Sequence, residues 1–254
     1  MADLPDFFPR IGRIANCFEQ IMGNRLIVSP HLDDAWFDLG GSITKWRAAG
    51  EAVSVIDVFS VQSWIRFDTL PPGLVTVIRK KEEEKNAKRD GVVLEYLDLP
   101  EGAIRGYKLV FPQTIDWAKD QLTMRRILTL LPKKSQFQNA ASIYFPLGIG
   151  GNVDHLLLRE AAISLRETIL SWGGRIAFYE DLPYATEHQL PTKFIVEMKL
   201  IPTLQEIDLE KKCASIRTYE SQIDESVVRN IKHHACSLGD GQSAYERVWI
   251  CPAR

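Results

Sequence analysis

The sequence predicts an α/β fold built on one mainly parallel sheet. Short apolar runs alternate with longer segments of helical periodicity, which is typical of repeated strand–helix–strand units. The run AVSVIDVFS at residues 52–60 is rich in β-branched residues and almost continuously apolar, as expected for a strand covered on both faces. A chain of 254 residues is long enough for one domain with a sizeable core.

Each element of this fold has its own signal along the chain. Strands are expected at residues 25–29, 52–60, 92–97, 142–145 and 175–179. Helices are expected between them, at residues 35–49, 75–89, 115–131 and 154–170. The last helix has the clearest periodicity, because Leu158, Leu165 and Ile169 fall on one stripe and the pair Gly173-Gly174 follows it.

The C-terminal part of the chain has a looser pattern. After residue 183, LEKKCASIRTYESQIDESVVRNIKHHA predicts one or two helices and AYERVWI a late strand. No internal repeat or low-complexity linker divides the chain. We therefore expect a single domain over residues 1–254, with a core at about 20–182 and a C-terminal elaboration at about 183–254. The charged run RKKEEEKNAKR at 79–89 is interpreted as a solvated helix face.

The composition excludes several classes of function. A net charge of -2 gives no basic surface for nucleic acid or an anionic membrane, and no apolar stretch is long enough to span a bilayer. The four cysteines are scattered without CxxC pairing, so we expect reduced thiols. The N-terminal stretch MADLPDFFPRIG lacks the apolar region of a signal peptide. A cytoplasmic protein is the expectation.

Two polar clusters follow strands of the predicted sheet. SPHLDDAWFDLGG places His31, Asp33 and Asp34 after the first strand, and PLGIGGNVDH places Asn152, Asp154 and His155 after the fourth. In open parallel sheets, ligands bind beyond the carboxyl ends of the strands, where the strand order reverses. If the strand order is 3-2-1-4-5, the two clusters face each other.

Together the clusters contain the residues of a catalytic metal site. His31, Asp34 and His155 supply two imidazoles and one carboxylate, a common zinc set that leaves a position for water. A metal held there lowers the pKa of water to about 7, and Asp33 is then available to take the proton. Each cluster alone has an ordinary explanation as a helix cap, so the prediction depends on the pair.

These motifs resemble the PIG-L/LmbE family of zinc-dependent N-deacetylases. The family carries a His-x-Asp-Asp motif after its first strand and a His-x-Asp-His-type motif after its fourth. FYEDLPYA (178–185), KKCASIRTYESQ (211–222) and Arg79 with Glu82 or Glu83 are similar to further family segments. The resemblance implies a Rossmann-like fold. It also implies a hydrolase that removes an N-acyl group, usually N-acetyl, from an amino sugar or glycoconjugate.

The resemblance also implies roles for individual residues. It assigns Zn²⁺ to His31, Asp34 and His155, although this ligand set also accepts other divalent transition metals. It assigns the general base to Asp33. Asp154 matches the aspartate that supports the neighbouring catalytic histidine in the family. A homo-oligomer is compatible with the resemblance, and no nucleic-acid partner is expected.

Asn152 is the main departure from the family pattern. In the family this position is a histidine that stabilises the oxyanion. Asn can donate a hydrogen bond through its amide but cannot carry a proton. Three explanations remain open: an enzyme that works with a neutral donor, an enzyme with shifted chemistry (another amide or an acyl transfer), and a metal-binding protein with little turnover. We favour the first, because the metal set and Asp33 are intact.

Four further residues are candidates for substrate contact. Arg79 comes from the resemblance, Trp64 and Tyr184 lie in loops after the second and fifth strands, and His188 follows Pro183. For Trp64 and Tyr184, packing in the core is the favoured interpretation, and substrate contact is the alternative. A dinucleotide-binding protein is disfavoured, because the first strand is followed by SPHLDDAWFDLGG instead of GxGxxG.

Overall fold

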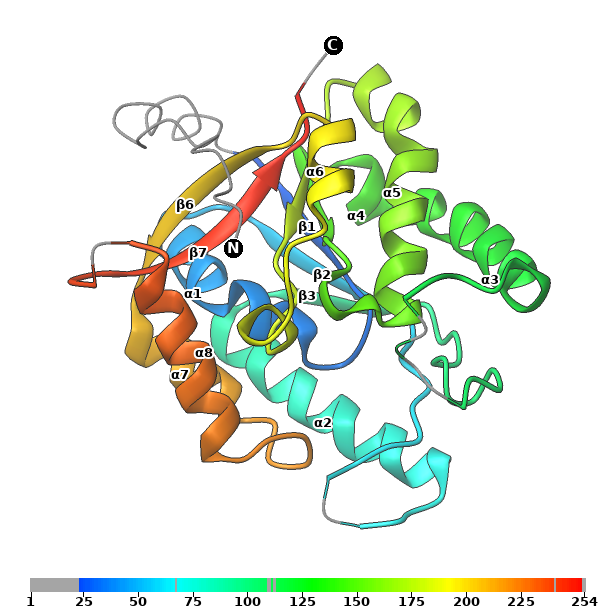
Figure 1. Ribbon diagram of the computed structural model, residues 1–254, viewed down its shortest axis with the longest axis horizontal. Coiled ribbons are helices and arrows are strands. Elements are labelled where there is room, and N and C mark those ends of the chain that lie inside the picture. The colour runs from blue at the N-terminus through cyan, green and yellow to red at the C-terminus, as the bar shows by residue number, and fades with distance from the viewer. Residues whose placement is uncertain (1–22, 67, 109–110, 112, 240, 253–254) are drawn as a thin grey trace, which may run out of the picture.

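The computed structural model contains one seven-stranded sheet covered on both faces by helices (Figure 1). The structure describes residues 23–66, 68–108, 111, 113–239 and 241–252. The strands are β1 (Arg25–Ser29), β2 (Val53–Asp57), β3 (Val93–Tyr96), β4 (Ser142–Pro146), β5 (Arg175–Tyr179), β6 (Ile201–Ile207) and β7 (Ala244–Ile250). The helices are α1 (Asp34–Ala48), α2 (Pro72–Asp90), α3 (Trp117–Leu130), α4 (Ser135–Gln138), α5 (Val153–Ser171), α6 (Thr192–Glu197), α7 (Leu209–Ile216) and α8 (Glu225–Ser237). Three 3₁₀ turns, η1 (Leu131–Lys133), η2 (Ile149–Gly151) and η3 (Tyr184–Thr186), complete the set.

The strand order is β3-β2-β1-β4-β5-β7-β6. The first five strands pair in parallel, which confirms the predicted order 3-2-1-4-5 and the α/β class. β7 and β6 extend the sheet as antiparallel strands beside β5. The C-terminal elaboration is therefore part of the same sheet and of the layer of helices on one face.

Two hydrophobic clusters lie on the two faces of the sheet. On one face, α3 and α5 bury Met124, Ile127 and Leu158 against β1 and β4. On the other face, α1, α7 and α8 bury Trp36, Ile216 and other apolar residues. Because β1 and β4 are adjacent, the turns that follow them meet at one edge of the sheet, between the two layers.

Helix α1 is kinked at Leu39, whose backbone dihedrals are non-helical. Lys212 Nζ donates to the carbonyls of Phe37 (2.7 Å) and Asp38 (3.1 Å), and Glu246 accepts from the backbone N–H groups of residues 41 and 42. Lys212 and Glu246 also form a buried ion pair at 2.5 Å. The pair thus satisfies the backbone groups that the kink removes from helical hydrogen bonding.

The start of the charged run 79–89 differs from its sequence-based interpretation. Arg79, Glu83 and Asn86 on α2 are buried, while their neighbours on the outer face of the helix are exposed. Asn86 donates to the carbonyl of Ser215, so this face of α2 packs against the segment around α7. The interpretation as a solvated face is wrong for that one stripe.

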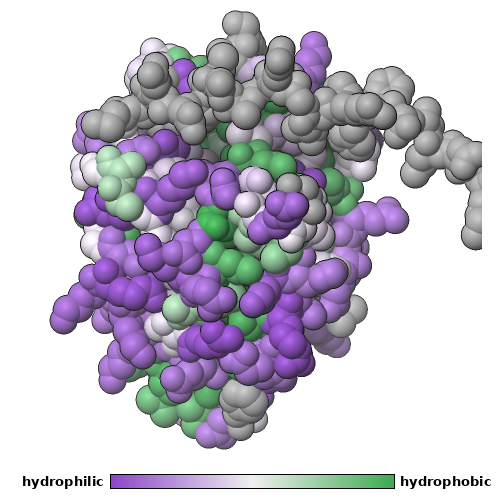
Figure 2. Space-filling view, turned by 90° about the vertical axis from the view of Figure 1, so that its left-hand side faces the viewer, coloured by the Kyte–Doolittle hydropathy of each residue, from purple (hydrophilic) through white to green (hydrophobic). Residues whose placement is uncertain are grey.

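The hydrophilic surface and the unpaired cysteines of the described residues are as the composition predicted. On the face over α7 and α8 seen in Figure 2, hydrophilic side chains predominate among the described residues. Within the described ranges, no helix has both the length and the apolarity needed to cross a membrane. Cys213, Cys236 and Cys251 are free thiols. Cys17 and the N-terminal stretch lie outside the described residues.

Candidate metal centre

The turn between β1 and α1 brings His31 and Asp34 together. Asp34 Oδ2 accepts a hydrogen bond from the backbone N–H of His31 at 2.9 Å, and it lies 3.1 Å from His31 Nδ1. Asp33 occupies the N-cap position of α1 but makes no side-chain cap hydrogen bond. The helix-cap explanation therefore does not account for either aspartate.

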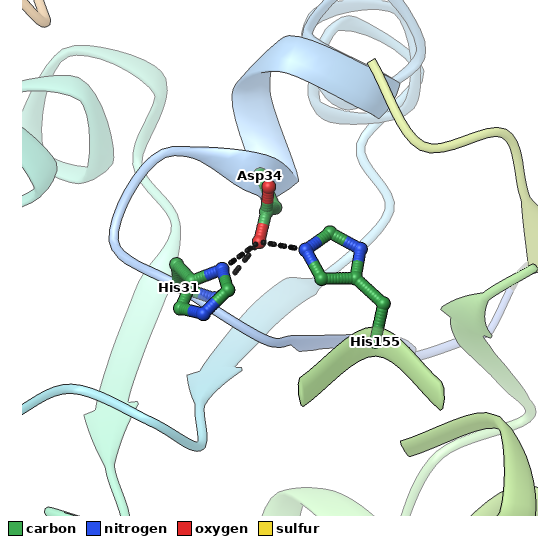
Figure 3. A group of neighbouring side chains, drawn as sticks. All are labelled: His31, Asp34 and His155. Atoms are coloured by element: carbon green, nitrogen blue, oxygen red, sulfur yellow. Dashed lines mark hydrogen bonds and ion pairs between the residues drawn. The ribbon is translucent and has the colours of Figure 1, made fainter. Parts of the chain in front are cut away.

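His155 completes the cluster from the first turn of α5. Its Nε2 lies 3.4 Å from Asp34 Oδ2, and its ring centroid lies 5.2 Å from that of His31. Figure 3 shows both imidazoles pointing toward the Asp34 carboxylate. One ligand atom from each of the three residues lies within 4.8 Å of the others. The structure thus brings together the three predicted ligands.

The donor set fits a divalent metal ion. His155 Nε2 is buried and has no hydrogen-bond partner among the described residues. Each imidazole has its other nitrogen held by a carboxylate: His31 Nε2 contacts Asp154 at 2.9 Å, and His155 Nδ1 contacts Asp181 at 2.6 Å. Metal-binding histidines typically have such an outer carboxylate, which fixes the tautomer and the ring orientation. Two imidazoles and one carboxylate suit zinc and related transition metals.

A substitution of Asp181 tests the contribution of its contact with His155 to metal binding. We expect Asp181→Asn to weaken zinc binding by about 10–100-fold, because the substitution keeps the size of the side chain but removes the charged acceptor of His155. Competition with a chelator measures the zinc dissociation constant. The neighbouring Glu180 is also buried, but it binds His234 and Arg247, so Glu180→Gln is the matched control and should leave zinc affinity unchanged. Equal zinc affinities for the wild type and Asp181→Asn would contradict the assignment.

Asp33 stands apart from the three ligands. Its Oδ2 forms an ion pair with Arg79 Nη2 at 2.7 Å, and both side chains are buried. Burial raises the pKa of Asp33 to about 6, against the lowering effect of the Arg79 guanidinium. A carboxyl whose pKa is close to neutrality is suited to both accepting and returning a proton. Arg79, predicted to contact the substrate, also lines the cavity beside Asp33.

Asn152 is held by the helix that it begins. Its Oδ1 accepts from the backbone N–H of Asp154 at 2.9 Å as the N-cap of α5, which leaves the amide nitrogen available as a donor. Asn152 also lines the cavity, as does Tyr184. The role of Asn152 as a neutral donor to the substrate stays a prediction.

Asp154 faces a different partner from the one the resemblance implied. Its carboxylate contacts His31, accepts from the backbone N–H of Gly102 at 2.8 Å, and pairs with Arg105 at 2.6 Å. It contacts Asn152 through its own backbone N–H, which donates to Asn152 Oδ1. Asp154 thus orients the ring of His31, and Arg105, which the motifs did not indicate, holds Asp154 in place.

A cavity of about 510 Å³ opens beside these residues. Trp64, which is 55% exposed, and Tyr184 line it, and their contact with a substrate stays a prediction. His188 is exposed and is not one of the lining residues, so its contact with a substrate stays a prediction. Several other lining residues were not predicted as site residues, namely Phe37, Glu101, Leu182, Ile223 and Val227. Phe37 and Leu182 nevertheless lie inside the motifs SPHLDDAWFDLGG and FYEDLPYA, which therefore gave a signal for this wall.

The sheet topology and the His–Asp–His cluster define an α/β protein with a buried group of potential metal ligands at its strand ends. The chain belongs to the PIG-L family, because the family model described as GlcNAc-PI de-N-acetylase matches residues 26–165.

Similar proteins share this architecture. 2'-N-acetylparomamine deacetylase from Streptomyces fradiae is 27% identical over 227 residues, which cover 84% of this chain and 78% of that protein. The zinc-inhibited form of teicoplanin deacetylase Orf2 has a TM-score of 0.70 at 18% identity, with 89% of this chain and 97% of that chain covered. The hydratase GalB from Pseudomonas putida KT2440 has a TM-score of 0.62 at 18% identity, with 92% and 98% covered. A deacetylase and a hydratase of solved structure therefore use the fold, so the fold alone does not define the reaction.

Proposed function

We propose that this protein hydrolyses the N-acyl amide, most simply N-acetyl, of an amino-sugar-containing compound. The observation that carries the proposal is the buried His31–Asp34–His155 cluster with a separate carboxylate, Asp33, on the wall of the same cavity. The family match and the deacetylase activity of the Streptomyces fradiae relative support it. We also propose zinc as the metal and the cytoplasm as the location.

The proposed reaction cleaves the amide C–N bond and forms a C–O bond from water. A zinc ion held by His31, Asp34 and His155 would supply Lewis acidity and lower the pKa of water to about 7. Asp33, held by Arg79, accepts a proton from the attacking water and returns it to the departing amine. The Asn152 amide donates to the oxyanion of the tetrahedral intermediate. The products are a carboxylate and a free amino sugar.

Metal removal and restoration test this function. We expect the purified protein to release acetate from at least one member of a panel that contains N-acetylglucosamine, N,N'-diacetylchitobiose and N-acetylated aminoglycosides. Chelation should abolish the release, and added Zn²⁺ or Co²⁺ should restore it. Bound metal without hydrolysis of any member would instead support a metal-binding protein.

Asn152 gives a prediction about the departure from the family pattern. We expect Asn152→Ala to lower kcat by about 10²–10³, the typical loss when one oxyanion donor is removed. Asn152→His should retain activity, because imidazole can also donate a hydrogen bond. Steady-state kinetics with a responsive substrate measure both variants. Asn152→Ala also removes the N-cap of α5, which costs about 1 kcal/mol of stability. Thermal denaturation measures this loss of stability separately from the loss of turnover. If both variants match the wild type, Asn152 has no catalytic role.

A further inference from the structure

The cavity has two walls of opposite character, one from each layer of the fold. Phe37, Leu182 and Ile223 belong to the hydrophobic cluster on the α1, α7 and α8 face, and Val227 packs against it. We call these four residues the apolar recess. All four side chains are apolar, so a group that enters the recess makes hydrophobic contacts and finds no side-chain hydrogen-bond partner there.

The apolar recess begins directly beside the candidate metal centre. Phe37 lies one turn beyond Asp33 and Asp34 on α1, so it projects from the same face of the helix. Leu182 follows Asp181, which holds the His155 ring. A substituent on an amide bound at the metal centre would therefore reach the recess without crossing a polar region.

The outer part of the recess is fixed to α2. The Tyr219 ring packs edge-on against Phe37 at 5.3 Å, and its hydroxyl donates to Glu83 at 2.6 Å. Ser221, two residues before Ile223, donates from its backbone N–H (2.9 Å) and its hydroxyl (2.6 Å) to Glu82. These contacts hold the segment that carries Ile223 in place, so the recess is formed before a ligand arrives.

The opposite wall carries polar groups. Glu101 is 8% exposed, and one of its oxygens accepts from both the backbone N–H and the hydroxyl of Ser63 at 2.6 Å. Asp154 lies beside Glu101, because its carboxylate accepts from the backbone N–H of Gly102 at 2.8 Å, and Asn152 is hydrogen-bonded to Asp154. A sugar, whose hydroxyl groups need hydrogen-bond partners when they are buried, is better satisfied on this wall than in the recess.

We propose that the apolar recess binds the acyl group of the substrate, and that this group is a hydrocarbon chain longer than acetyl. The proposal rests on the proposed N-acyl hydrolase function and deepens it. The amide lies between the two walls at the metal centre, so the sugar and the acyl group extend in opposite directions. The cavity of about 510 Å³ has the size of a site for a ligand larger than one sugar ring.

An acyl-length series on the wild-type, zinc-loaded protein tests this directly. The substrates are N-acetyl-, N-butyryl- and N-octanoyl-glucosamine, each with a methyl and an octyl glycoside, and the release of free amine gives kcat/KM. Each methylene that becomes buried contributes about fourfold, so we expect kcat/KM to rise at least tenfold from acetyl to octanoyl. A rise that follows the octyl glycoside instead of the acyl chain would overturn the proposal, as would a fall with acyl length. In both cases deacetylation itself would stand. Hydrolysis of no member would overturn the proposed function as well.

Variants of Val227 locate the effect in the recess. Val227 lies on the first turn of α8 and is partly exposed, so Val227→Trp fills the recess without burying a larger side chain in the core. We expect it to lower the octanoyl-to-acetyl ratio of kcat/KM at least tenfold. Val196 is 68% exposed on α6 and does not line the cavity, so Val196→Trp is the matched control and should keep the wild-type ratio. Inhibition of the wild type by octanoate and acetate gives an independent measurement without any variant. Stronger inhibition by acetate, or an unchanged ratio in a folded Val227→Trp protein, would overturn the proposal.

Discussion

The substitution Asp33→Asn is expected to lower kcat for amide hydrolysis by about 10²–10⁴, the usual contribution of a positioned general base. Asparagine has nearly the same shape as aspartate, but its amide cannot accept a proton from water near neutral pH. The metal content should stay at the wild-type level, because Asp33 contacts Arg79 and is not part of the His–Asp–His cluster. Single-turnover kinetics and metal analysis of the same preparation measure the two quantities.

Two further variants serve as controls for Asp33→Asn, one at a candidate metal ligand and one at the surface. His155→Ala removes a candidate ligand and should lose bound metal and activity together. Asp98→Asn changes an aspartate outside the cavity that pairs with Lys80 at the surface, and it should change neither quantity. If Asp33→Asn keeps full activity with metal bound, another group takes the proton and the assignment of the base is wrong.

The parallel part of the fold was predictable because its signals are local. Strands β1 and β5 begin and end at the predicted residues, since each is a compact apolar run bounded by turn residues. β6 was not predicted, because it is an edge strand that contains Pro202 and has mostly partly or fully exposed side chains. The short helix α6 was also missed, because six residues give too little periodicity.

In the candidate site, too, the residues that were predictable are those with a local sequence signal. His31, Asp34 and His155 stand in motifs at strand ends, where the topology itself brings them together. Asp181 contacts His155, 26 positions away, and Arg105 contacts Asp154, 49 positions away. A local sequence pattern cannot predict such pairings. The apolar recess combines α1, the turn after β5 and the start of α8, so only the folded chain defines it.

The burial of Lys212 could not be predicted from its sequence context. In the run LEKKCASI it has the same immediate surroundings as Lys211, yet it is fully buried, and Lys211 is largely exposed. Its partner Glu246 lies 34 residues away on β7. A charge in this position is tolerated only because the carboxylate and two carbonyls at the kink of α1 surround it.

We expect Lys212→Met to lower the free energy of unfolding by about 3–5 kcal/mol, because it leaves the buried Glu246 carboxylate without its counter-charge and two carbonyls without a donor. Urea denaturation followed by circular dichroism measures the loss. Lys211→Met removes the neighbouring surface lysine, which pairs with Asp208, and should cost less than about 1 kcal/mol. The double variant with Glu246→Gln should be less destabilised than the sum of the two single variants, because it no longer buries an unpaired charge. Equal effects of Lys211→Met and Lys212→Met would show that the ion pair does not support the kink of α1, which follows Asp34 and Phe37 in the chain.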